Sequence, residues 1–262
     1  MTELLELPER TIKPRSTGLT HVLDRGLSVH GVESLIEVAG EHIDIVKLGW
    51  GTALVTGNLE AKVARYQEHG LPVVLGGTLT ELAIHQDRLD ALLQWASRLR
   101  LQHVEISDGT ITLPHEEKLD LIERLSSDFT VLSEVGSKDN TRIMAPYRWV
   151  ELIQAELEAG AWKVIAEARE SGTSGIYRHD GEVRMGLIDE IVHAVDPDSL
   201  IFEAPRKDQQ VWFIRRFGAN VNLGNVVPED VVSLETMRLG LRSDTALGGV
   251  GAGLQEEGVR GE

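Results

Sequence analysis

Residues 199–224 read SLIFEAPRKDQQVWFIRRFGANVNLG, and this stretch contains one full repeat of the pattern that decides the fold. Its apolar start, 199–204, is typical of a buried strand, and a second apolar run begins at residue 220. Between them, the aromatic spacing of 211–218 predicts a helix that packs on the strands, and Gly218 suits the end of that helix. The stretch therefore predicts a strand, a helix and another strand in succession.

The same alternation recurs along the chain, with helical stretches of about 10–20 residues between short apolar runs. The expected strands are 20–24, 43–48, 72–76, 103–107, 130–135, 163–168, 199–204 and 220–224. Eight β–α repeats in about 230 residues favour the α/β class and a single (β/α)8 TIM barrel. An open doubly wound sheet is the alternative, but DRGLSVHG, which follows the first strand, lacks the G-x-G-x-x-G turn typical of that fold.

The two ends of the chain differ in composition from the part between them. We expect an N-terminal arm over 1–15, the barrel over 16–243, and a flexible glycine-rich tail over 244–262. The chain contains no apolar run long enough for a membrane span, and its first residues lack the apolar core of a signal peptide. We therefore expect a cytoplasmic protein with no membrane partner.

The residue composition excludes several kinds of site and partner. The chain of 262 residues has 26 Lys and Arg against 42 Asp and Glu, a formal net charge of −16, and it has no cysteine. The absence of cysteine excludes disulfides and thiolate metal sites. A chain this acidic repels a phosphate backbone, so no nucleic acid partner is expected. An anionic substrate would need a local cluster of cations, or a metal ion, to overcome this field.

Polar residues interrupt the expected strands close to their C-terminal ends, where a parallel barrel should be apolar. They are Asp24, Lys47, Glu105, Asp108, Glu134, Glu167, Glu203 and Asn222. In each strand the polar residue can face the barrel axis, and buried carboxylates need a counter-charge. An all-oxygen set favours Mg²⁺ or Mn²⁺ over Zn²⁺. Alternatively, the acids form a salt-bridge lattice with cations that lie at or after the same strand ends: Lys47, Lys138, Arg169 and Arg206.

The cations and glycines at these strand ends predict an anionic ligand with more than one charged group. The loops 171–175 and Gly224-Asn225 are candidates for binding phosphate, and 76–78 is a weaker one. Trp50 lies between glycines at a strand end, where it could line the mouth. His21 and His103 start strands and so face away from this end; we expect no histidine base.

Several segments together resemble the phosphosulfolactate synthase family, which adds sulfite to phosphoenolpyruvate in coenzyme M biosynthesis. They are KLGWGT (47–52), GGTLTE (76–81), EISDGT (105–110), LSEVGSKD (132–139), EARESG (167–172) and the long run 201–225. The resemblance implies a (β/α)8 lyase that uses Mg²⁺, an enolase-like mechanism, a homo-oligomer, and (2R)-phospho-3-sulfolactate as product. Two alternatives stay open: a metal-dependent barrel lyase that joins phosphoenolpyruvate to another nucleophile, and a non-catalytic heat-stress-associated homologue.

The resemblance and the residue pattern together suggest a role for each candidate. The expected metal ligands are Glu105, Glu134 and Glu167, with Asp108 as a fourth. Lys138 is the expected proton donor. Lys47 and Arg169 are expected to be catalytic and, with Arg206, to bind phosphate and sulfite. The remaining expected substrate contacts are Gln210, Asn222, Gly224 and Asn225, with Glu203 as a further contact at the rim.

Overall fold

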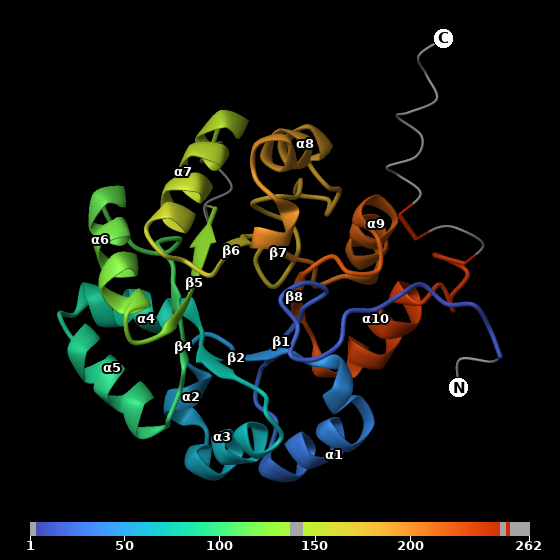
Figure 1. Ribbon diagram of the computed structural model, residues 1–262. Helices are drawn as coiled ribbons and strands as arrows, with labels where there is room; N and C mark the ends of the chain where they lie inside the picture. Colours follow the sequence, from blue (N-terminus) through green and yellow to red (C-terminus); the bar gives the residue numbers. More distant parts are fainter. Residues whose placement is uncertain (1–3, 137–143, 247–249, 252–262) are drawn as a thin grey trace.

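The computed structural model describes residues 4–136, 144–246 and 250–251. Eight parallel strands form one sheet in the order β3-β2-β1-β8-β7-β6-β5-β4. The strands are β1 (Thr20–Asp24), β2 (Ile45–Leu48), β3 (Val73–Leu75), β4 (His103–Ile106), β5 (Thr130–Val135), β6 (Lys163–Ala166), β7 (Leu200–Glu203) and β8 (Leu223–Val226). The sheet curls into a nearly closed barrel (Figure 1). Its seam lies between β3 and β4, the two ends of the strand order. The predicted (β/α)8 fold is confirmed.

The helices surround this barrel (Figure 1). They are α1 (Val29–Ala39), α2 (Thr52–Val55), α3 (Leu59–Glu68), α4 (Gly77–His85), α5 (Leu89–Arg98), α6 (His115–Ser126), α7 (Pro146–Glu158), α8 (Met185–Ala194), α9 (Lys207–Phe217) and α10 (Val231–Arg238). Gly218 ends α9 at a φ of 91°, a backbone angle that residues other than glycine rarely adopt. Phe213 of α9 stacks on Phe202 of β7 with 4.5 Å between ring centroids. This contact confirms the predicted packing of the 211–218 helix on the strands.

The barrel axis changes character from one end to the other. At the N-terminal ends of the strands the interior is an apolar layer, formed by Leu19, Ile45, Val74, Leu132, Ile165 and Ile201. Two residues further along several of these strands, the inward side chains are charged: Lys47 follows Ile45, Glu134 follows Leu132, and Glu203 follows Ile201. The alternation of a strand places these charges on the same inward face. The C-terminal end of the barrel is therefore the polar end.

The chain ends lie against the barrel where they are described. Residues 4–15 contain no helix or strand, and Arg10 anchors them by donating to Glu235 of α10 at 2.9 Å and to Asn220 at 2.6 Å. The Oγ1 of Thr245 donates to the carbonyl of Met237 at 2.7 Å, so the first residues of the expected tail pack on α10. Among the described helices, none is both long enough and apolar enough to cross a bilayer.

Candidate active site

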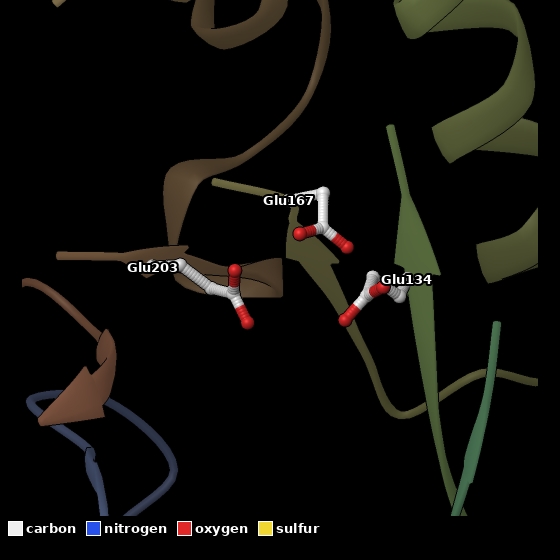
Figure 2. A group of neighbouring side chains, drawn as sticks. All are labelled: Glu134, Glu167 and Glu203. Carbon is white, nitrogen blue, oxygen red and sulfur yellow. The ribbon is translucent and has the colours of Figure 1, made fainter. Parts of the chain in front are cut away.

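Four glutamates from neighbouring strands meet inside the polar end of the barrel. Glu105 lies on β4, Glu134 on β5, Glu203 on β7, and Glu167 directly follows β6; each is at most 5% exposed. The carboxylates of Glu134, Glu167 and Glu203 point toward one another (Figure 2). One oxygen from each of these three lies within 4.8 Å of the others, so they could hold a metal ion together. We call these three residues the carboxylate cluster.

Lys47 of β2 is the cation that faces this group. Its Nζ lies 3.2 Å from Glu105 Oε2, 3.4 Å from Glu203 Oε1 and 3.9 Å from Glu134 Oε2. Burial lowers the pKa of Lys47, but the surrounding carboxylates outweigh burial and raise that pKa above its usual value. Lys47 is therefore an ammonium at neutral pH.

Burial has the opposite consequence for the acids. It raises the pKa of Glu203 to about 7, helped by the charge of Glu134 and opposed by Lys47. Burial likewise raises the pKa of Glu105 above its usual value. The protein thus places four acidic side chains in a buried region where the charge of a carboxylate is unfavourable. Among the described residues, the ammonium of Lys47 faces them.

Backbone amides hold three of the carboxylates in place. Glu105 Oε1 accepts from the amide of Gly77 at 2.6 Å, which bridges the seam between β3 and β4. Glu203 Oε2 accepts from the amide of Ala168 at 2.8 Å, and Glu167 Oε1 accepts from the amide of Arg169 at 2.7 Å. A Cβ on Gly77 would lie 2.7 Å from Glu105 Oε1, so glycine is required there for this close approach.

Above the four glutamates a cavity of about 300 Å³ opens to solvent. Its rim contains groups that bind anions: the Arg169 side chain, the Thr78 and Ser171 hydroxyls, and the Asn225 amide. A larger hollow of about 760 Å³ lies at the opposite end of the barrel, next to the N-terminal arm. We place the chemistry in the smaller cavity because it holds the carboxylate cluster and because TIM-barrel active sites lie at the C-terminal ends of the strands.

Known proteins resemble this chain over almost its whole length. A sequence model of the (2R)-phospho-3-sulfolactate synthase (ComA) family matches residues 8–244. The phosphosulfolactate synthase of Bacillus subtilis (strain 168) is 44% identical over 244 residues, which cover 92% of this chain and 97% of that protein. The chain belongs to the phosphosulfolactate synthase family. This membership confirms the resemblance seen in the segments between residues 47 and 225.

Two further comparisons concern another relative and a solved structure. The phosphosulfolactate synthase of Methanothermobacter thermautotrophicus is 41% identical over 244 residues, covering 91% of this chain and 95% of that protein. Among solved structures, a 3-hexulose-6-phosphate synthase aligns with a TM-score of 0.54 at 12% identity, covering 84% of this chain and all of that one. The second similarity concerns the fold alone, and it agrees with the barrel described above.

The structure of this family member brings only part of the expected metal set together. Glu134 and Glu167 belong to the carboxylate cluster, but its third member is Glu203, which we expected only as a rim contact. Glu105 lies beside the cluster and faces Lys47 and Gly77. The expected role of Asp108 as a ligand is not supported, because its carboxylate pairs at 2.9 Å with Lys118 of α6 and does not line the cavity.

The expectation that Asp24 faces the barrel axis is wrong. Its carboxylate points into the helical layer, where it lies 2.7 Å from Lys62 Nζ and accepts from the Tyr66 hydroxyl at 2.9 Å. Its neighbour Leu23 lines the cavity instead. Successive side chains of a strand face opposite sides, so a one-residue error in assigning the inward face exchanges these two positions.

Four expected substrate contacts do not line the cavity. Asn222 lies at the N-terminal end of the barrel, where its Oδ1 accepts from the amide of Leu19 at 3.0 Å. Gln210 donates to the carbonyl of Ala204, and Arg206 donates to the carbonyl of Asp180. Gly224 is buried within the barrel, where an added Cβ would lie 2.9 Å from Ile201. We no longer assign substrate contacts to these four.

The remaining candidates lie either in the cavity or outside the described residues, and two further residues of the cavity were not candidates. Lys47, Arg169 and Asn225 line the cavity, as does Trp50, which is 40% exposed. Lys138 lies outside the described residues. Thr78 and Ser171 were not singled out, although the 76–78 and 171–175 loops that contain them were.

Neither of the two histidines that start strands, His21 and His103, lines the cavity. His21 is fully buried below the glutamates, and burial lowers its pKa well below the usual value. Burial also lowers the pKa of His103 to about 4, and that residue lines the hollow at the opposite end of the barrel.

Lys47 does pair with three acids, so part of the salt-bridge alternative holds.

Proposed function

We propose that this chain is a lyase that adds sulfite to phosphoenolpyruvate and forms (2R)-phospho-3-sulfolactate. Membership of the phosphosulfolactate synthase family supports the reaction. The observation that carries the proposal is the convergence of three buried carboxylates beside the Lys47 ammonium, at the base of a cavity with Arg169 on its rim. Both substrates are anions. The cavity contains carboxylates that could bind a metal cation, and the cationic side chains of Lys47 and Arg169, which could bind the anions.

The residues fit a bound divalent cation. Four buried glutamates would repel two anionic substrates, especially in a chain with a net charge of −16. Carboxylate oxygens are the ligands that Mg²⁺ prefers, and those of Glu134, Glu167 and Glu203 are close enough to share one ion. When bound, Mg²⁺ would act as a Lewis acid for the carboxylate of the substrate. We therefore propose a Mg²⁺ site at the carboxylate cluster.

The proposed reaction places a definite demand on the protein. The sulfur lone pair of sulfite forms a C–S bond to the CH2 carbon of phosphoenolpyruvate, and the π electrons of the double bond move toward the substrate carboxylate. A proton then arrives at the carbon that carries the phosphate ester. Lys47, charged and buried, stabilises the growing negative charge in a low-dielectric site.

The rim of the cavity serves the parts of the substrates that do not react. Arg169 is exposed at the mouth and lines the cavity together with Ser171, and both side chains could bind a phosphoryl or sulfonate oxygen. Thr78, at the start of α4, and Asn225, at the end of β8, offer further polar groups. Lys138 stays our predicted proton donor. A cytoplasmic location and a homo-oligomeric state likewise stay predictions.

The test is to incubate the purified protein with phosphoenolpyruvate and sulfite, with Mg²⁺ or with EDTA, and to follow products by ³¹P NMR. We expect a new phosphate-ester signal with Mg²⁺ and none with EDTA. Product formed only with a nucleophile other than sulfite would favour the alternative lyase. No product with any nucleophile, from protein that is folded and loaded with Mg²⁺, would favour a non-catalytic relative.

A further inference from the structure

A fully buried ion pair lies just outside the barrel, behind the carboxylate cluster. Lys118 of α6 and Glu156 of α7 are each 1% exposed, and Lys118 Nζ lies 2.8 Å from Glu156 Oε1. Burial lowers the pKa of Lys118, but Glu156 and Asp108 outweigh burial and raise it, so the lysine stays charged. Both helices cover β5 (Figure 1).

This ion pair contacts β5 at two successive residues, Ser133 and Glu134. Lys118 Nζ donates to the backbone carbonyl of Glu134 at 2.7 Å, and the Ser133 hydroxyl donates to Glu156 Oε2. Ser133 faces outward and Glu134 inward, as successive strand residues do. The ion pair therefore holds the backbone of β5 from outside at the point where β5 carries a member of the carboxylate cluster on the inside.

The sheet itself cannot supply this hold. The carbonyl of Val135 accepts from the amide of Glu167 across to β6, so the carbonyl of Glu134 points the other way, toward β4. The last residue of β4 to pair with β5 is Ile106, opposite Ser133. The Glu134 carbonyl thus extends beyond the β4 ladder, and Lys118 takes the place of the missing strand partner.

Lys118 also connects the segment after β4 to the same point. Its Nζ lies 2.9 Å from Asp108 Oδ1, in the connection between β4 and α6. One ammonium thus links α6, α7, the end of β5 and the β4–α6 connection. A buried ion pair is often replaceable by apolar residues without loss of stability, so stability alone does not explain why such a pair is placed here.

We propose that Lys118 and Glu156 are positioning residues that hold Glu134 in the geometry the metal site needs. This inference rests on the proposed metal site at the carboxylate cluster. Partners that lie behind metal ligands typically change metal affinity by about 10–100-fold when they are removed. Neither residue lines the cavity, so the effect of the pair would pass through the backbone of β5.

The chain offers a matched control on another strand. Lys62 of α3 is 2% exposed and pairs with Asp24 of β1 at 2.7 Å. This is also a buried lysine of the helical layer that holds the C-terminal end of a strand. However, β1 contributes no residue to the carboxylate cluster. Loss of Lys62 should disturb folding without disturbing the metal site.

The experiment compares four proteins by Mn²⁺ titration, with free Mn²⁺ measured by electron paramagnetic resonance, and by thermal melting in EDTA. The variants are Lys118→Met with Glu156→Leu, Lys62→Met, and Glu134→Gln as the reference for a lost ligand. We expect the double variant to keep a cooperative melt and to raise the Kd for Mn²⁺ about 10–100-fold. We expect Lys62→Met to melt earlier and to keep its Kd within twofold of the parent.

The following results would overturn the inference. A double variant that binds Mn²⁺ within twofold of the parent removes the positioning role alone, and so does a Lys62→Met variant weakened as much as the double variant. If the double variant does not fold, Glu156→Gln, which preserves the shape, decides at the same twofold threshold. A parent that does not bind Mn²⁺, or that binds it as well after Glu134→Gln, contradicts the proposed metal site itself and with it this inference.

Discussion

Replacing Glu203 by glutamine should remove a pH-dependent instability from the metal-free protein. Glu203 is buried, and its pKa rises from an ordinary 4.5 to about 7. Between these values the folded protein keeps a proton on Glu203 that the unfolded chain has released. Because the unfolded state then binds fewer protons than the folded one, the free energy of unfolding falls as pH rises through this window. The difference between the two pKa values corresponds to about 3 kcal/mol.

Glutamine resembles the protonated acid, so the Glu203→Gln variant should match the parent near pH 4.5. Above pH 7 it should be more stable by up to about 3 kcal/mol. Urea unfolding in EDTA at several pH values between 4.5 and 8 measures this difference. Glu170→Gln is the control: its side chain is 44% exposed at the rim, so it should stay within about 0.5 kcal/mol of the parent throughout. A Glu203→Gln difference that does not change with pH would refute the reasoning.

Three further predictions concern single residues. Tyr66→Phe removes the 2.9 Å hydrogen bond to buried Asp24 and should lower the free energy of unfolding in urea by about 1–3 kcal/mol, with synthase activity retained; an unchanged urea midpoint would contradict it. Gly175→Ala should sharply lower the melting temperature, since at a φ of 60° the new Cβ would lie 1.8 Å from the Glu167 carbonyl; a melt like that of the parent would speak against this placement of the loop. Arg169→Ala should leave the melting temperature unchanged and lower kcat/KM for phosphosulfolactate formation about 10²–10³-fold, and a loss under threefold would remove Arg169 from the mechanism.

The sequence was sufficient for the architecture but not for the facing of every strand residue. The alternation of apolar runs and helical stretches predicted all eight strands, because each unit repeats the same pattern. In a parallel barrel both faces of a strand are buried, so hydrophobic alternation does not distinguish inside from outside. Val22 and Leu23 are both buried and apolar, and the sequence therefore left the direction of Asp24 undecided.

The same limitation shaped the prediction of the site. Glu134 and Glu167 were identified because charge is unexpected in buried strands, and Glu203 carried the same signal with an uncertain role. Asn225 lines the cavity and Asn222 does not, and no pattern in the sequence reveals this difference. It depends on the structure of β8, where the pairing with β1 shifts register and Asn225 adopts a φ of 54°. The Lys118 contacts depend on how α6 and α7 are placed on β5, which no local pattern encodes.

The central claim is that Glu134, Glu167 and Glu203 together hold one divalent cation. Crystals grown with Mn²⁺ and measured near the manganese absorption edge test it most directly, through the anomalous difference map. We expect one strong peak for an ion that is coordinated by an oxygen of each of the three carboxylates. Crystals of Glu167→Gln should show no peak at this position. A map without a peak among these carboxylates, or with the strongest peak elsewhere on the protein, would contradict the account.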